Sequence, residues 1–167
     1  MGLLDGQVAC VTGGTRGIGR GTAEAFLREG ASVVVNGRSE EKGARALEEM
    51  GGGDQVHFIA GDVKSRGGCE AIVNGAVEHF GRIDILVNIA GITARFPTTE
   101  IGAETVRRLT EVNYYGTFWM CKEVGKLMLV QGGGNVVNMS ALGGGFLGTG
   151  RSEEHTSELQ SRAYLVC

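Results

Sequence analysis

Residues 8–20 read VACVTGGTRGIGR, an apolar run that enters a cluster of glycines and then a helical pattern. The run Val8–Thr12 is typical of a strand buried on both faces. The spacing Thr12-Gly13-x-x-x-Gly17-x-Gly19 removes side chains from the turn, so backbone amides and a helix N-terminus can approach a pyrophosphate. A glycine-rich turn that only packs a helix closely against a strand would look the same.

The rest of the chain alternates apolar runs with helical patterns. Four further buried strands are expected, at Ser32–Asn36, Gln55–Gly61, Ile83–Asn88 and Asn135–Ser140. Helices are expected at Gly17–Glu29, from a cap at Ser39 to Met50, at Lys64–Phe80, and over a long helical region from Glu100 to about Gln131. This alternation predicts the α/β class, with a doubly wound parallel sheet covered on both faces and ending after the fifth strand. Residues 1–150 form the expected, incomplete domain.

Composition limits the classes of function. A chain of 167 residues with 42% hydrophobic and 21% charged residues suits one soluble domain. The net charge of −3, without a basic cluster, argues against a nucleic-acid partner. The four cysteines are far apart and lack neighbouring histidines, so we expect no metal site and no disulfide framework. Asp5 interrupts any signal-peptide run, and no apolar segment is long enough to cross a membrane, which favours the cytoplasm.

Further motifs follow the later strands in a fixed order. Asp62-Val63 follows the third strand, Asn88-Ile89-Ala90-Gly91 ends the fourth, Asn113 lies in the long helical region, and Ser140 ends the fifth strand. Together with the glycine turn, residues 5–148 resemble the short-chain dehydrogenase/reductase family. The resemblance implies a Rossmann-type fold and hydride transfer between a nicotinamide and a small carbonyl compound or secondary alcohol. It also implies that the parent enzyme is a homo-oligomer.

The resemblance assigns a set of residues to the cofactor. Asp62 would bond the adenine amino group, Val63 would pack on the ring, and Asn88–Gly91 would lie beneath the nicotinamide-side ribose. Two alternatives stay open: Asp62 as a turn residue at a strand end, and Asn88 as a structural bond between strands. The full set is Thr12, Gly13, Thr15, Arg16, Gly17, Ile18, Gly19, Arg38, Asp62, Val63, Asn88, Ala90 and Gly91.

The end of the second strand bears on the choice of cofactor. NAD enzymes carry an acidic residue about 20 positions after the glycine turn, where it bonds the ribose 2′-hydroxyl. Here the strand ends Val35-Asn36-Gly37-Arg38, without a carboxylate. Arg38 and Arg16 can form charge-assisted bonds to a 2′-phosphate, so NADP(H) is favoured over NAD(H). The alternative is that both arginines are solvated surface side chains.

The catalytic set of the resembled family is only half present. That family uses a tyrosine, a lysine four residues later, a serine and a helix asparagine. Ser140 and Asn113 match the serine and the asparagine, whereas the expected tyrosine and lysine positions hold Glu153 and Ser157. A glutamate is normally an anion at neutral pH and has no proton to give. We therefore expect this chain to be catalytically inactive.

The stretch RSEEHTSELQSR, residues 151–162, follows directly on VVNMSALGGGFLGTG, a strand pattern with the glycine-rich loop after it. It resembles translated sequencing-adapter DNA, so residues 151–167 are expected to be a non-native, disordered tail on a fragment of a longer enzyme. The fifth strand would then be an unpaired apolar edge, prone to aggregation. The alternatives are a natural divergent tail, and a natural non-catalytic dinucleotide-binding or regulatory module.

Overall fold

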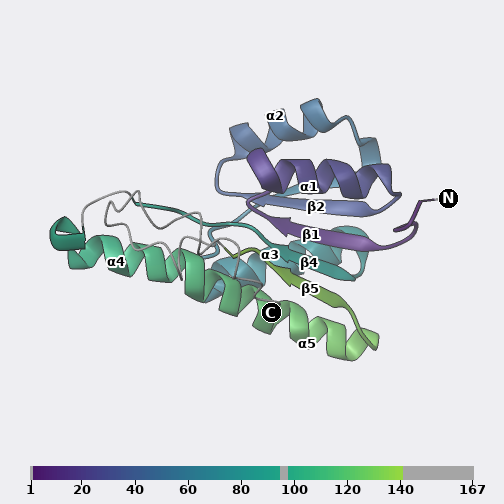
Figure 1. Ribbon diagram of the computed structural model, residues 1–167. Helices are drawn as coiled ribbons and strands as arrows, with labels where there is room; N and C mark the ends of the chain where they lie inside the picture. The colour runs from purple at the N-terminus through teal and green to yellow at the C-terminus, as the bar shows by residue number, and fades with distance from the viewer. Residues whose placement is uncertain (1, 95–97, 141–167) are drawn as a thin grey trace, which may run out of the picture.

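Five strands form one parallel sheet in the computed structural model, which describes residues 2–94 and 98–140 (Figure 1). The strand order is β3-β2-β1-β4-β5, and every neighbouring pair is parallel. The strands are β1 (Val8–Thr12), β2 (Ser32–Gly37), β3 (Val56–Ala60), β4 (Ile85–Asn88) and β5 (Asn135–Asn138). The direction of winding reverses at β1, which has β2 on one side and β4 on the other. The predicted doubly wound sheet is confirmed.

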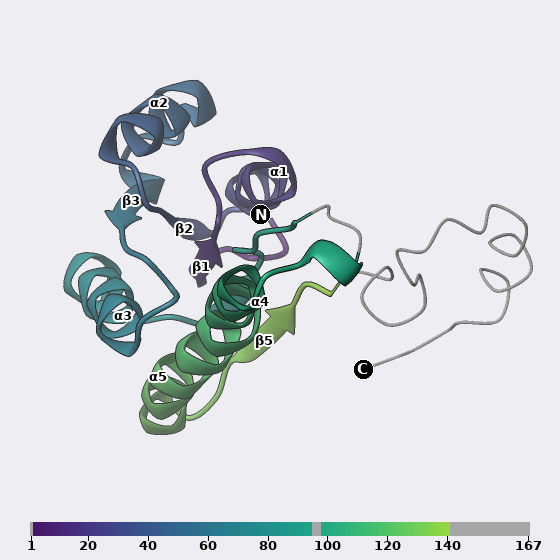
Figure 2. The ribbon, with the colours of Figure 1, turned by 90° about the vertical axis from the view of Figure 1, so that its left-hand side faces the viewer.

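Helices cover both faces of the sheet. They are α1 (Gly17–Arg28), α2 (Glu40–Met50), α3 (Arg66–Phe80), α4 (Ala103–Leu109) and α5 (Gly116–Gln131), with the short helical turns η1 (Gly53–Gln55), η2 (Thr98–Glu100) and η3 (Thr110–Tyr115). Figure 2 shows α1 and α2 on one face and α3 and α5 on the other. In the described part of the chain, no helix has both the length and the apolar character that crossing a bilayer requires.

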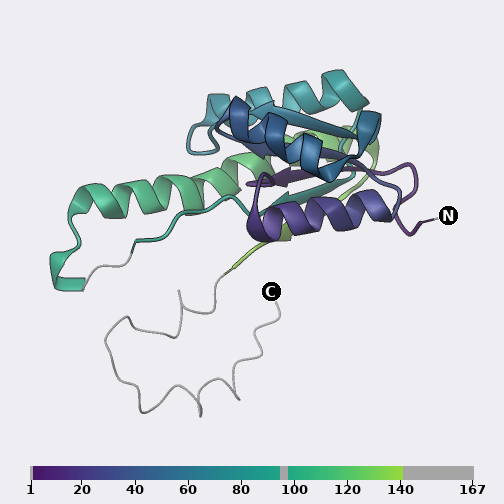
Figure 3. The same ribbon diagram turned by 90° about the horizontal axis from the view of Figure 1, so that it is seen from above.

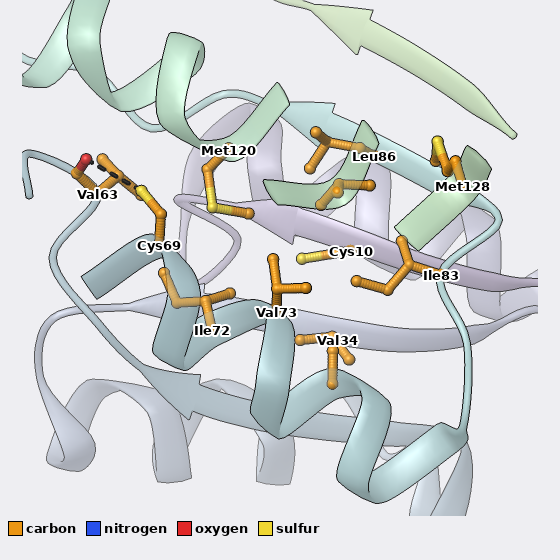
Figure 4. Packing of buried hydrophobic residues seen from close by; sticks show 12 residues of the cluster. Cys10, Val34, Val63, Cys69, Ile72, Val73, Ile83, Leu86, Met120 and Met128 are labelled. Atoms are coloured by element: carbon orange, nitrogen blue, oxygen red, sulfur yellow. Dashed lines mark hydrogen bonds between the residues drawn. The ribbon is translucent and has the colours of Figure 1, made fainter. Parts of the chain in front are cut away.

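The alternation of side chains along the strands produces two separate core clusters. In β1, Ala9 and Val11 point towards α1 and α2, where they pack with Ala23 of α1. Cys10 points the other way, into a cluster formed with α3 and α5 (Figure 4). Both clusters consist largely of fully buried aliphatic side chains, which explains why the strands are apolar throughout.

Local side-chain chemistry sets the ends of the helices. Ser39 caps α2 as predicted, with its Oγ accepting from the Lys42 amide at 3.3 Å. Ser65 caps α3 in the same way, accepting from the Gly68 amide at 3.1 Å. The helices end at Gly51 and Gly81, which have φ of 65° and 79°. Glycine adopts this left-handed conformation without steric cost, so these ends could be read from the sequence.

The long helical region predicted between Glu100 and Gln131 is interrupted. It consists of α4 and α5 joined by η3, a π-helical turn that contains Asn113. A π turn inserts an extra residue into the helical repeat and often marks a functional position. The helical period alone did not predict this break. Figure 3 shows α4 continuing past the end of the sheet towards which the strand arrows point.

Strand β5 differs from the other four strands in its exposure. All four of its residues are exposed, with Val136 at 43% and Val137 at 52%. Among the described residues, β5 pairs only with β4. The outer edge of β5 therefore has no partner strand among these residues, which is the exposed apolar edge that the sequence predicts. The expected tail at residues 151–167, with Glu153 and Ser157, lies outside the described residues.

Candidate functional site

The glycine turn between β1 and α1 brings two loops into close contact. Gly13 has φ of 67°, and a Cβ there would lie 2.9 Å from the Cα of Ala90. A Cβ on Gly19 would lie 2.3 Å from the carbonyl oxygen of Gly13. Any larger residue at either position would force the backbone apart. Close packing of the helix against the strand therefore requires both Gly13 and Gly19, which agrees with a purely structural role for these two. Packing does not explain Gly17.

The N-terminus of α1 is open where the turn faces outward. Gly17 has φ of 55°, and no atom lies within 4 Å of the position that its Cβ would occupy. Arg16 precedes the helix without a capping side-chain bond, and no acidic residue occupies the first turn. Ile18 is 65% exposed, although it is a large apolar residue. These amides and this apolar surface fit a bound anion with an attached organic group, which the residues present could hold.

Thr15 lies on the inner side of the same turn. A Cβ on Gly37 at the end of β2 would meet Thr15 Cγ2 at 2.8 Å, so the two residues are in close contact. Gly14 donates its amide to the Asn36 carbonyl at 3.0 Å. The turn is thereby attached to the carboxyl end of β2 as well as to that of β1.

Thr12 ties the first turn to the loop after β4. Its Oγ1 accepts from the amides of Ile89 and Ala90, at 3.0 and 3.1 Å, and Thr12 is only 1% exposed. The segment Asn88–Gly91 therefore lies beside the glycine turn, at the point where the winding of the sheet reverses. In doubly wound sheets, this crevice at the carboxyl ends of the strands is where ligands bind.

The Asn88 side chain forms a hydrogen bond between neighbouring strands, which is the structural role that the sequence offered as an alternative to cofactor binding. Its Nδ2 donates to Asn138 Oδ1 of β5 at 2.9 Å and contacts Cys121 Sγ at 3.4 Å. Asn88 is 4% exposed, and its Oδ1 has no hydrogen-bond partner among the described residues. The side chain thus joins β4 to β5 at the carboxyl edge. The side-chain amide nitrogen of Asn88 is thus used between strands, whereas its Oδ1 is free to accept a bond.

Asp62 and Val63 follow β3 at the same edge of the sheet. Asp62 Oδ1 accepts from the Lys64 amide at 3.1 Å, and Oδ2 lies 3.7 Å from Lys64 Nζ, which is the turn geometry of the alternative reading. Val63 is only 5% exposed and packs against Gly116 of α5. Asp62 stays partly exposed and can still accept a bond, whereas Val63 has little surface left for an adenine ring.

A pocket of about 650 Å³ opens beside Asp62 at this edge. The β2 and β3 loops form one side through Arg38, Asp62, Lys64 and Ser65, and the segment from α4 to η3 forms the other. Arg38 is exposed and lines the pocket. The sequence did not predict the α4 side, because the path of α4 depends on the loop that precedes it and on the π-helical turn that follows.

Asn113 holds the loop after β4 against η3. Its Oδ1 accepts from the Ile92 amide at 2.8 Å, and its Nδ2 donates to the Ile92 carbonyl at 2.9 Å. The fifth strand ends at Asn138, two residues before the predicted end at Ser140, and Ser140 is exposed just beyond it. Both predicted catalytic residues therefore lie at the carboxyl side of the sheet, although Asn113 already uses its amide group on the backbone of Ile92.

The thiols among the described residues are structural in character. Cys10 and Cys69 are buried, and Cys121 is partly buried. Burial raises the pKa of Cys10 and of Cys69 to about 12, so both remain protonated at neutral pH. In residues 2–94 and 98–140, no cluster of three or more side chains of the metal-binding types is present. The fourth cysteine, Cys167, lies outside these ranges.

Comparisons with known proteins agree with this geometry. The sequence model described as short chain dehydrogenase matches residues 7–152. D-threitol dehydrogenase of Mycolicibacterium smegmatis is 41% identical over 140 residues, which are 83% of this chain and 54% of that protein. The NADP-dependent (R)-specific alcohol dehydrogenase of Lentilactobacillus kefiri is 36% identical over 142 residues, 84% of this chain and 56% of that enzyme.

Solved structures show the same similarity. A variant of actinorhodin polyketide ketoreductase with NADPH superposes with a TM-score of 0.80 at 37% identity, over 86% of this chain and 56% of that one. A short-chain type dehydrogenase/reductase from Mycobacterium ulcerans gives 0.79 at 29% identity, over 84% of this chain and 53% of that one. The chain thus spans little more than half the length of these relatives.

Proposed function

Because the chain belongs to the short chain dehydrogenase family, we propose that it is the nucleotide-binding part of an NADP(H)-dependent oxidoreductase. In this proposal, the complete enzyme transfers a hydride between the nicotinamide and a small carbonyl compound or secondary alcohol. The expected setting is a homo-oligomeric enzyme of the cytoplasm. The similar proteins are named for substrates as different as threitol and a polyketide.

The observation that carries the proposal is the open N-terminus of α1 beside the crevice at β1 and β4. The amides around Gly17 have no side-chain cap, and the helix dipole favours a negative charge at that end. The exposed side chain of Ile18 lies next to these amides. A diphosphate with an attached organic group would satisfy the amides and cover this apolar surface.

Arg38 supports the choice of NADP(H). It follows β2 directly, lines the pocket beside Asp62 and is exposed, and no carboxylate lies at that strand end to accept bonds from a ribose diol. Arg16 is exposed at the neighbouring turn. One relative is named as NADP-dependent, and one similar structure was solved with NADPH.

The chain's own residues would orient the reactants. The bound cofactor would supply the hydride acceptor or donor. Ser140, exposed at the end of the β5 segment, would donate a hydrogen bond to the substrate oxygen, and Asn113 would keep the loop at Ile92 in place beneath it. Neither side chain supplies a mobile proton. With Glu153 and Ser157 where the resemblance expects tyrosine and lysine, we expect binding without turnover. Loss of general acid catalysis alone costs about 10²–10⁴-fold in rate.

A natural non-catalytic dinucleotide-binding or regulatory module is the second candidate. It is favoured by Glu153 and Ser157 themselves, because a regulatory protein needs neither the proton donor nor the lysine. The gene sequence beyond codon 150, read from an independent clone, separates the two candidates. A tyrosine and a lysine at codons 153 and 157 would support the enzyme, and the same glutamate and serine would support the module.

Titration of the purified chain with NADPH and NADH tests the cofactor assignment. We expect tighter binding of NADPH, and we expect Arg38→Gln to remove most of that preference while leaving NADH binding unchanged. Arg45→Gln on the exposed side of α2 is the matched control, because it removes the same charge outside the pocket. Tighter binding of NADH than of NADPH by the unaltered chain would overturn the assignment.

A further inference from the structure

The pocket beside Asp62 has charged walls on two sides. Arg38, Asp62 and Lys64 form the wall that comes from the ends of β2 and β3. Glu104, Arg107, Arg108 and Glu111 form the opposite wall, along α4 and the start of η3. The first wall contains Arg38 and Asp62, which the sequence already predicted to bind the cofactor. The helix α4, which carries most of the second wall, projects past the carboxyl edge of the sheet (Figure 1).

Ion pairs among these residues leave two of the arginines without a carboxylate partner. Asp62 lies 3.7 Å from Lys64 Nζ. Arg107 donates from Nε to Glu104 Oε2 at 3.1 Å and lies 3.8 Å from Glu111 Oε1. All three carboxylates of the pocket are thus engaged by Lys64 and Arg107. Within the described residues, neither Arg38 nor Arg108 forms an ion pair, so two unpaired arginines from different elements line the pocket.

Two unpaired guanidinium groups across one pocket fit a dianion better than a neutral group. A phosphate monoester carries about −1.5 to −2 charges at pH 7 and can accept bidentate bonds from arginine. A ribose diol would leave both cations without a counter-charge. Arg107 does not compete for this role, because Glu104 holds it: the hydrogen bond to Glu104 raises the pKa of the Arg107 guanidinium above its ordinary value.

We propose that Arg108 is a specificity-determining residue that binds the 2′-phosphate of the adenosine ribose from the α4 side, opposite Arg38. This inference rests on the proposed NADP(H) function and adds a second contact, from an element that follows β4. Selection of NADP(H) would then depend on the position of α4. The same helix runs into η3, where Asn113 holds the loop after β4, so the 2′-phosphate and the catalytic edge would be linked through one helical segment.

Binding of adenosine 2′,5′-bisphosphate and of 5′-AMP, measured by calorimetry on the full chain, tests the inference. We expect Arg108→Gln to weaken the bisphosphate about tenfold and to change 5′-AMP binding by less than about twofold. Arg108→Lys should lose less than Arg108→Gln, because it keeps the charge. Arg28→Gln, at the exposed C-terminal end of α1, is the charge-matched control and should leave both ligands unchanged.

The outcomes separate this inference from the function on which it rests. If Arg38→Gln removes the preference for the bisphosphate and Arg108→Gln does not, Arg108 has no such role and the cofactor assignment stands. Equal weakening of both ligands by Arg108→Gln would place its contact elsewhere and overturn the inference. If the unaltered chain binds the two ligands equally, or binds neither, both the NADP(H) function and the role of Arg108 fall.

Discussion

Replacing Thr12 by valine tests the tie between the two nucleotide-side loops. The side chain is 1% exposed, and its Oγ1 accepts from the amides of Ile89 and Ala90. Valine has nearly the same shape but no acceptor, so two amides lose their partner. An unsatisfied buried donor costs about 1–3 kcal/mol. Ile89 and Ala90 are only partly buried, so we expect a loss of about 2–4 kcal/mol in the free energy of unfolding.

Urea unfolding measures this loss. With a denaturant slope of about 2 kcal/mol per M, the midpoint should fall by about 1–2 M. Thr12→Ser is the control, because it keeps the hydroxyl and removes one methyl group, which costs about 1 kcal/mol. A Thr12→Val protein within about 0.5 kcal/mol of the unaltered chain would refute the reasoning. So would a serine variant as unstable as the valine variant, because the loss would then come from packing.

Three further predictions follow from other residues of the site and the core. Gly19→Ala should weaken NADPH binding at least about tenfold, because the new Cβ would lie 2.3 Å from the Gly13 carbonyl; Gly21→Ala, in open space on the same helix, should bind normally and be slightly more stable. Burial raises the pKa of Cys10 from an ordinary value of 9.0 to about 12, because the folded protein disfavours the thiolate. The contribution of the protonated thiol to the free energy of unfolding is therefore complete below pH 9 and is lost as the pH rises towards 12. At pH 10, urea unfolding should show the unaltered chain losing about 1 kcal/mol more than Cys10→Ala, relative to pH 7; an equal loss in both would contradict the burial argument. Asn113→Ala should speed hydrogen exchange of the Ile92 amide, whereas Asn113→Asp, which keeps the acceptor, should protect it; unchanged exchange in the alanine variant would mean that the bond is not formed in solution.

The sheet could be predicted largely from the sequence because its signals are local. Apolar runs bounded by glycine gave β1 at its observed bounds, and the cap at Ser39 gave the start of α2. The third strand was predicted two residues too long in total, from Gln55 to Gly61 instead of Val56–Ala60, because Gln55 belongs to η1. The fourth was placed too early, at Ile83, because a buried aliphatic residue next to a strand has the same pattern as a residue within it.

The site was harder to predict, because its walls come from distant segments. The glycine turn and the loop after β4 were predicted from motifs, and the tie through Thr12 brings them together. The sequence did not show that Asn113 bonds the backbone of Ile92, or that Arg38 and Arg108 line one pocket. Both depend on the π-helical turn and on the path of the chain before α4, which no short-range pattern encodes. The buried position of Val63 against Gly116 likewise follows from helix packing.

The strand order also has a consequence for synthesis on the ribosome. Strands β1, β2 and β3 are consecutive in the chain and adjacent in the sheet, so they can pair as soon as they leave the exit tunnel. The other edge of β1 pairs with β4, where Thr12 lies opposite Asn88, so this edge has no partner until β4 has been synthesised. The nascent chain therefore carries an exposed central strand for the time needed to translate about one further helix and strand, and an unpaired strand edge of this kind is prone to aggregate.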